Sequence, residues 1–139
     1  METLFANGEN TIQFDNYTDE TNPGGDLRLL VVVKSCGFMG QQEVIFSQDD
    51  ITVFGQCVSK LINGSGSSAV LKSNRCDEFI IEIKPNHANA LVVTGQLSSS
   101  EPAETTAFNH SLRFSFALQF TDLTRVLGLP ILAEHRGSP

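Results

Sequence analysis

The sequence predicts a single α+β domain, built on a mostly antiparallel sheet of about seven strands with one main amphipathic helix. Apolar and polar residues alternate over much of the chain, as they do in half-buried antiparallel strands. Residues 49–63 instead carry apolar side chains at helical spacing. A length of 139 residues leaves room for one hydrophobic core. The polar N-terminal segment 1–10 and the polar tail 134–139 are expected to fray.

Three strands are predicted in the first third of the chain. Residues 11–17 alternate with Ile12 and Phe14 on one face, which indicates an edge strand. Residues 27–33 are apolar on both faces in their second half, so they fit a central strand covered on both sides. The Gly-Phe-Met-Gly sequence at 37–40 predicts a hairpin turn, and residues 42–46 then return as a strand.

The main helix, at residues 49–63, has recognisable start and stop signals. Ser47 is a preferred N-cap residue, and the carboxylates of Asp49 and Asp50 suit the positive end of a helix dipole. Asn63-Gly64 supplies a terminator that tolerates a left-handed backbone. Apolar residues recur at helical spacing between these signals, at Ile51, Phe54, Val58, Leu61 and Ile62.

The second half of the chain predicts a β-meander and a short helix. Four strands are expected, at 69–73, 79–84, 90–97 and 110–120, and the serine-rich segment 98–106 is expected to be an exposed loop. The last strand alternates most clearly, with Leu112, Phe114, Phe116, Leu118 and Phe120 on one face. A capped helix at 121–128 follows it. Ten phenylalanines and no tryptophan predict a core filled by phenylalanine.

The cysteines and the apolar segments favour a cytoplasmic protein. Cys36, Cys57 and Cys76 are odd in number and widely spaced, which argues against a disulfide framework or a zinc site. Each is expected to be a small buried or half-buried residue. The first residues lack the basic and apolar regions of a signal peptide, and the apolar run 29–33 is too short to cross a membrane.

No catalytic, metal or cofactor motif is present in the sequence, so we expect no enzymatic activity. His87, His110 and His135 lack the spacing of a metal site. No serine lies in the Gly-x-Ser-x-Gly pattern of a nucleophile elbow. The Gly-Ser loop at 64–68 lacks the lysine of a phosphate-binding loop. We therefore predict no catalytic residues, no metal and no cofactor.

Acidic residues are concentrated in the first 50 positions. Nine acids and two bases there give a charge of −7, which is the net charge of the whole chain, and the seven acids and seven bases that follow cancel. This balance opposes binding to nucleic acid, because phosphate contacts need lysine and arginine. The acidity either serves solubility alone or steers a basic protein partner. The second reading predicts a partner-binding patch at Asp15, Asp19, Glu20 and Asp26.

The order of the predicted elements resembles that of the WapI-type immunity proteins and related small bacterial domains. A strand ends at Gly37-Phe38, and a return strand leads through Asp49-Asp50 into the main helix. A meander then ends in an L-x-F-x-F strand (Leu112, Phe114, Phe116) before a leucine-rich helix at 123–129. The resemblance covers residues 11–132. It implies a cytosolic bacterial protein that binds and neutralises a toxin domain without catalysing a reaction.

Two other functions are open at this stage. The first is a small-ligand-binding protein or minor enzyme whose site lies between the helix and the sheet, with His87, His110 and Cys76 as polar participants. The second is a homo-oligomer that pairs through the edge strand at 11–17 or through the outer face of the last strand.

Overall fold

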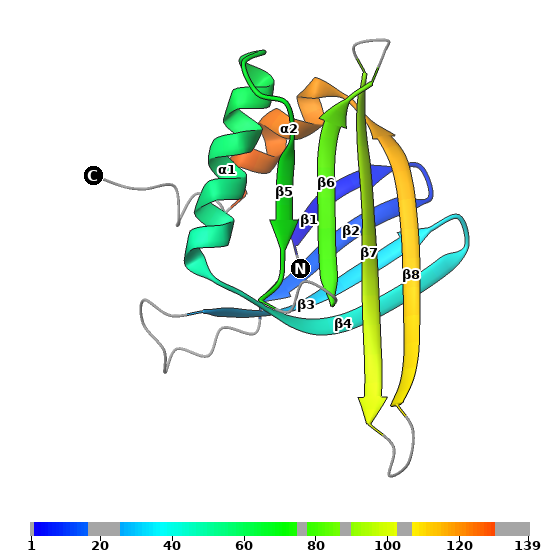
Figure 1. The fold of residues 1–139 in the computed structure, drawn as a ribbon. Helices are drawn as coiled ribbons and strands as arrows, with labels where there is room; N and C mark the ends of the chain where they lie inside the picture. The colour runs from blue at the N-terminus through cyan, green and yellow to red at the C-terminus, as the bar shows by residue number, and fades with distance from the viewer. Residues whose placement is uncertain (1, 17–25, 75–77, 87–89, 103–106, 130–139) are drawn as a thin grey trace.

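The chain forms two four-stranded antiparallel sheets and two helices, in a computed structural model that describes residues 2–16, 26–74, 78–86, 90–102 and 107–129 (Figure 1). Sheet A contains β1 (Glu2–Asn7), β2 (Asn10–Asn16), β3 (Leu27–Ser35) and β4 (Phe38–Phe46), in that order. Sheet B contains β5 (Ala69–Lys72), β6 (Phe79–Pro85), β7 (Leu91–Pro102) and β8 (Ala107–Leu118). Helix α1 (Gln48–Ile62) connects the two sheets, and α2 (Phe120–Leu127) follows β8.

The α+β class is thus confirmed, whereas the prediction of one sheet with about seven strands is wrong in its detail. The eight strands divide into two separate meanders because α1 interrupts the strand order between β4 and β5. Both predicted helices are present, within one residue of their expected ends. Figure 1 shows sheet A behind sheet B with its strands running across those of sheet B, and with the helices at one side.

The additional strand is β1, which lies in the segment that the sequence predicts to be frayed. Leu4 and Phe5 are both buried although they are adjacent in the chain. The pairing of β1 with β2 shifts register between Thr3 and Phe5, and this irregularity lets two neighbouring side chains enter the core. A strand of this kind lacks simple alternation, so its pattern is not visible in the sequence. The tail at 134–139 lies outside the described residues.

The hairpin turn after β3 lies earlier than the sequence predicts. Cys36 and Gly37 form it, with φ values of 51° and 87°, and Ser35 pairs with Phe38 on either side. Two central residues with positive φ are the pattern of a type I′ turn, which matches the twist of antiparallel strands. Phe38 therefore begins β4, and Gly40 lies inside that strand. The prediction of a turn at 37–40 is wrong because a cysteine rarely adopts a left-handed backbone.

The β7–β8 hairpin is longer than the sequence predicts. The two strands pair from Leu91 with Leu118 as far as Pro102 with Ala107, so most of the expected loop at 98–106 is strand. Residues 103–106 lie outside the described part of the chain. In Figure 1 this hairpin extends beyond the other strands of sheet B. The extension is not predicted because residues 98–102, Ser-Ser-Ser-Glu-Pro, show no alternation of apolar and polar side chains.

Both helices begin directly after the last strand of a sheet, but the hydrogen bond that caps the first turn differs between them. Ser47 accepts a hydrogen bond from the backbone N–H of Asp50 at 3.1 Å, as the capping prediction requires. At α2, Asp122 accepts one from the backbone N–H of Gln119 at 2.9 Å. Phe120 begins α2 and is 43% exposed, so its predicted place on the core face of the last strand is wrong.

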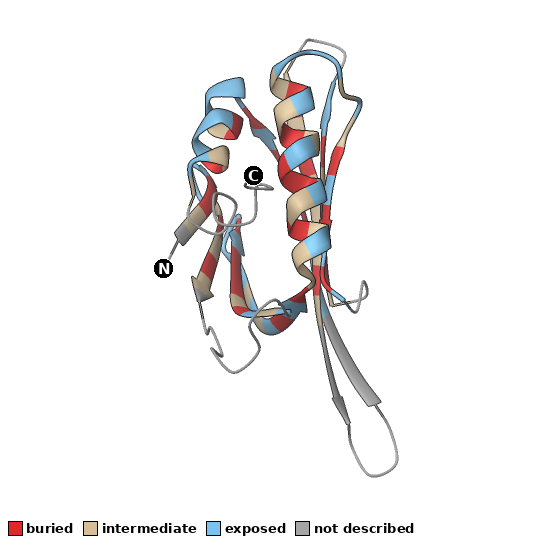
Figure 2. Cartoon of the chain, turned by 90° about the vertical axis from the view of Figure 1, so that its left-hand side faces the viewer, coloured by how far each residue is buried: buried red, intermediate tan, exposed pale blue. Residues whose placement is uncertain are grey.

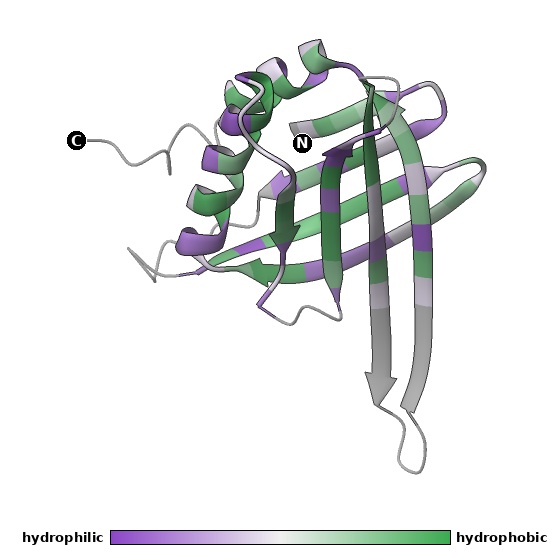
Figure 3. Cartoon of the chain, turned by 45° about the horizontal axis from the view of Figure 1, so that its top comes forward, coloured by the Kyte–Doolittle hydropathy of each residue, from purple (hydrophilic) through white to green (hydrophobic). Residues whose placement is uncertain are grey.

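The core lies between the inner faces of the two sheets and is closed by the helices. Buried residues recur along α1 and along the strands of both sheets (Figure 2), and hydrophobic and hydrophilic residues alternate on the strands (Figure 3). The prediction of a phenylalanine core is confirmed by five fully buried rings, those of Phe5, Phe14, Phe46, Phe54 and Phe79. Three of them meet where the sheets join. The distance between ring centroids is 5.9 Å for Phe14–Phe46 and for Phe46–Phe79, and 6.2 Å for Phe14–Phe79.

Replacing Gly95 with alanine should destabilise the protein by about 1–3 kcal/mol, the usual cost of overpacking a core. A Cβ at position 95 would lie 2.7 Å from the carbonyl oxygen of Ile80 and 2.5 Å from Cζ of Phe114. Urea unfolding followed by circular dichroism measures the change in unfolding free energy. Ser115→Ala, at an exposed position of the neighbouring strand, should change that free energy by less than about 0.5 kcal/mol. Equal stability of the Gly95→Ala and wild-type proteins would contradict this packing.

Candidate functional site

The outer face of sheet A is the candidate functional surface. The two helices pack against β5, β1 and each other, and the outward residues of β2, β3 and β4 are exposed or half-buried with one exception. The exception is Val32, which lies between its cross-strand neighbours Gln13 and Gln41. We call this set of outward side chains the sheet A surface: Thr11, Gln13, Asp15, Arg28, Leu30, Val32, Lys34, Met39, Gln41, Glu43 and Ile45.

Two carboxylates lie in one cross-strand row of this surface. Asp15 pairs with Leu30, and Leu30 pairs with Glu43 on its other side. Two strand spacings separate the acids, which is roughly 10 Å. Arg28 Nε lies 3.5 Å from Glu43 Oε1, with both side chains about half exposed. Such a pair contributes roughly 0–1 kcal/mol to stability, so an incoming cation can compete with Arg28 at little cost.

Of the four acids that the sequence groups into one patch, the structure describes two, Asp15 and Asp26. Asp15 lies on the sheet A surface, whereas Asp26 precedes β3 and accepts a hydrogen bond of 2.9 Å from Asn74 Nδ2. Asp19 and Glu20 lie outside the described residues. The neighbour that the tertiary structure gives Asp15 is Glu43, which the sequence analysis did not propose. Alternation within the strand at 42–46 places Glu43 on the outward face, but only the strand pairing brings it into the row of Asp15.

Large apolar side chains are exposed at both ends of β4, and one of them, Ile45, lies two residues from Glu43 on the same face. Phe38 is 68% exposed and Met39 62% exposed at the start of the strand, and Ile45 is 37% exposed near its end. Burying such groups against a partner removes apolar area from water and so favours association. β4 therefore combines exposed apolar groups with a carboxylate on one edge strand of the sheet.

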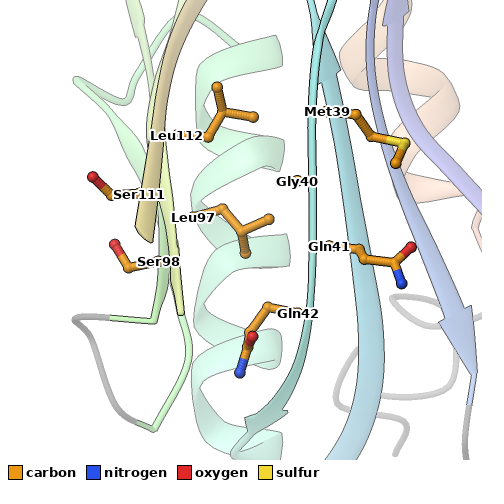
Figure 4. A pocket seen from close by; sticks show the side chains of 8 residues that line it. All are labelled: Met39, Gly40, Gln41, Gln42, Leu97, Ser98, Ser111 and Leu112. Atoms are coloured by element: carbon orange, nitrogen blue, oxygen red, sulfur yellow. The ribbon is translucent and has the colours of Figure 1, made fainter. Parts of the chain in front are cut away.

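A small cleft of about 160 Å³ lies between β4 and the β7–β8 hairpin. Leu97 and Leu112 point from that hairpin toward β4, at the level of Gly40 (Figure 4). Sites for cofactors and drug-sized ligands occupy roughly 300–1,000 Å³, so the cleft is small for them. It also lies between the two sheets rather than between helix and sheet, where the small-ligand hypothesis expects a site.

The residues proposed for that small-ligand hypothesis are not assembled in the described structure. Cys76 and His87 lie outside the described residues. The backbone of His110, in β8, pairs with that of Ser99 in β7. Within the described ranges, no group of three His, Cys, Asp or Glu residues could hold a metal ion. Cys57 is half-buried in α1, as expected, whereas Cys36 is exposed at the β3–β4 turn. None of the helices in the described part is long and apolar enough to cross a membrane.

Comparison with known proteins assigns no family to the chain. No family model, no curated protein and no solved structure matches it. What the protein binds must therefore be inferred from its own surface, where β2 and β4 place Asp15 and Glu43 beside exposed apolar side chains.

Phe38→Ala should leave the unfolding free energy within about 0.5 kcal/mol of wild type, because an exposed side chain loses little contact on truncation. Phe46→Ala, at the other end of the same strand, should cost about 3–5 kcal/mol because its ring is fully buried. Urea unfolding of both variants measures the difference. A large loss of stability in Phe38→Ala would show that this ring packs against the rest of the protein and is not available to a partner.

Proposed function

We propose that this protein is a non-enzymatic binding module that recognises a basic protein partner through the sheet A surface. The observation that carries the proposal is the row of Asp15 and Glu43 on a sheet face that the two described helices leave open, with the exposed Ile45 two residues from Glu43 on the same face. Interfaces commonly place apolar anchors within a polar rim. Binding to such a partner requires this surface alone and no chemical step by the protein.

The acidic charge belongs to the N-terminal segment as a whole, because on the sheet A surface itself Asp15 and Glu43 are balanced by Arg28 and Lys34. The net charge of −7 belongs to the first 50 residues, and sheet A spans residues 2–46 of them. The outer face of sheet B differs, because Lys72, Lys84 and Arg113 outnumber Glu82 on it. A basic partner is therefore attracted to the N-terminal segment as a whole and repelled by the outer face of sheet B. Such asymmetry raises association rates and orients the encounter.

The resemblance to WapI-type immunity proteins supports a more specific form of the proposal. In that form, the partner is a toxin domain with a basic active surface, such as a nuclease, and the protein neutralises it in the bacterial cytoplasm. Carboxylates then occupy the positions where nucleic-acid phosphates bind. Inhibition of this kind requires contact with the toxin and no chemical step by the inhibitor.

Asp15→Asn and Glu43→Gln should each slow association with the partner about threefold at low salt, because each removes one charge from the steering field. The partner is first captured from the source cell or produced from the neighbouring gene, and association is then followed by biolayer interferometry. High salt should reduce the difference between variant and wild type, since screening weakens long-range attraction. Glu82→Gln, the same change on the outer face of sheet B, should leave the rate unchanged.

Two results would contradict the proposal. One is an equal association rate for all three variants, and the other is persistent failure to capture any protein at low salt. The double variant Asp19→Asn/Glu20→Gln, measured in the same assay, tests whether those two acids contribute to the surface as the sequence predicts.

A further inference from the structure

The free edge of β4 carries backbone N–H and C=O groups that point away from the rest of sheet A. β4 is the last strand of that sheet, and β3 pairs with one of its two sides. Ser35 and Phe38 flank a two-residue turn, so they form a hydrogen-bonded pair, and such pairs alternate with non-hydrogen-bonded pairs along an antiparallel ladder. The backbone groups of Met39, Gln41 and Glu43 therefore face the free edge.

One contact shows that this edge accepts a backbone hydrogen bond. The N–H of Asn74 donates to the carbonyl oxygen of Ile45 at 2.7 Å, and Ile45 belongs to the same alternating set as Glu43. The chain just after β5 thus occupies one end of the edge. Among the described residues, no backbone hydrogen bond occupies the edge at Met39, Gln41 or Glu43. These positions leave room for an extended segment of about five residues.

The cleft between β4 and the β7–β8 hairpin lies beside this free edge. Met39 and Gln41 line it although their side chains point to the outer face of β4 (Figure 4), so they line it with their backbone. The hairpin crosses the inner face of β4, where a Cβ at Gly40 would lie 3.3 Å from Cδ2 of Leu97 and 3.5 Å from Cδ2 of Leu112. It then continues beyond the edge of β4 (Figures 1 and 3). The hairpin therefore provides a floor on which one added strand can lie.

The two faces of an added strand would meet different surroundings. A residue opposite Gly40 has its side chain on the inner face, beside Leu97 and Leu112, so an apolar side chain fits there. The residue three positions away lies opposite Glu43 and has its side chain on the outer face, where a basic group complements the carboxylate. The site thus suits an extended segment with an apolar and a basic residue three positions apart.

A second copy of the chain fits this edge less well than a single segment. If two β4 strands paired antiparallel, the twofold axis would be perpendicular to the joint sheet, and both β7–β8 hairpins would lie on the same side of it. Each hairpin continues beyond the edge of its own β4 (Figure 1), so the two hairpins would overlap. An extended segment of another protein avoids this overlap.

We propose that the free edge of β4 binds an extended segment of the protein partner by strand addition. Recognition of this kind takes affinity from main-chain hydrogen bonds and selectivity from alternate side chains. The inference rests on the proposed function in one respect, since the partner of the sheet A surface is the protein that carries the segment. Glu43 joins the two sites, because its side chain belongs to that surface and its backbone to the edge.

The peptide N-acetyl-Lys-Thr-Thr-Val-Thr-amide tests the edge without the partner. In antiparallel pairing its lysine lies opposite Glu43 and its valine opposite Gly40. Nitrogen-15 NMR follows the backbone amides of the protein while the peptide is added. The amide signals of Met39, Gln41 and Glu43 should shift and saturate at millimolar concentration, because a short peptide loses much conformational freedom when it is ordered.

Two isomers of this peptide separate backbone pairing from side-chain contact. N-methylation of the third residue, opposite Gln41, removes an N–H that faces β4 and should weaken binding about tenfold, because a hydrogen bond is lost and an acceptor is left unpaired. N-methylation of the second residue, also a threonine, alters an N–H that points away from β4. This isomer should bind like the unmodified peptide.

Gln41→Pro is the matching change in the protein. It removes the N–H of residue 41 from the free edge, where proline is tolerated, and should also weaken binding about tenfold. Gln41→Ala keeps that N–H and removes only the outward side chain, so it should bind like wild type. Thermal melting establishes the folding of each variant, and the two peptide isomers decide the question if Gln41→Pro does not fold.

Equal binding of the two N-methyl isomers would overturn the proposal, and so would a folded Gln41→Pro variant that binds the peptide like wild type. Light scattering adds a further test. A wild-type dimer that dissociates in Gln41→Pro would overturn the proposal, since a second copy would then occupy the edge.

Partner binding separates the failure of this inference from that of the proposed function. If Gln41→Pro binds the partner as tightly as wild type, strand addition is refuted and the sheet A surface stands. If the peptide isomers differ as expected but Asp15→Asn and Glu43→Gln leave association unchanged, the edge site stands and the basic partner is refuted.

Discussion

The contact of Phe14, Phe46 and Phe79 is the interaction on which the rest of the structure depends. The three rings come from β2, β4 and β6, so they join sheet A to sheet B. Phe79 meets the other two rings edge to face, and Phe14 and Phe46 are tilted at 57° to each other. Edge-to-face pairs contribute roughly 0.5–1.5 kcal/mol each beyond the area that they bury. One backbone hydrogen bond crosses the same junction, from the N–H of Asn74 to the carbonyl of Ile45 at 2.7 Å. Within sheet B, Ser73 Oγ bonds to the backbone of Phe79 and holds that residue in place.

Each sheet and the helix that follows it form one half of an approximate structural repeat. Four antiparallel strands lead into a helix twice, and the two helix starts share Asp-Ile-Thr at 50–52 and Asp-Leu-Thr at 122–124. A buried apolar residue precedes each N-cap and another follows it four positions later, which is the hydrophobic staple that sets the angle of a helix to the preceding chain. The same local chemistry thus turns both strands, β4 and β8, into helices that close the core.

β4 connects the fold with the proposed function because its two faces have different roles. Its inward residues include Val44 and Phe46 in the core and Gly40 at the cleft. Its outward residues include Met39 and Glu43, which face a partner in our proposal. An edge strand suits this division, since its outer face and one side stay accessible while its inner face holds it to the core. A change on one face of β4 can therefore alter binding without altering stability.

The sequence by itself determined the α+β class, both helices, most strand positions and the location of the charge. These follow from local periodicity and capping, as at Ser47 and along Phe114 to Leu118, which act over a few residues. Only the tertiary structure decided that the strands form two sheets, that Leu4 and Phe5 enter the core through an irregular strand, and that Asp15 lies in the row of Glu43. The physical reason is that strand pairing and sheet packing join residues far apart in the chain, and no local pattern records which partners meet.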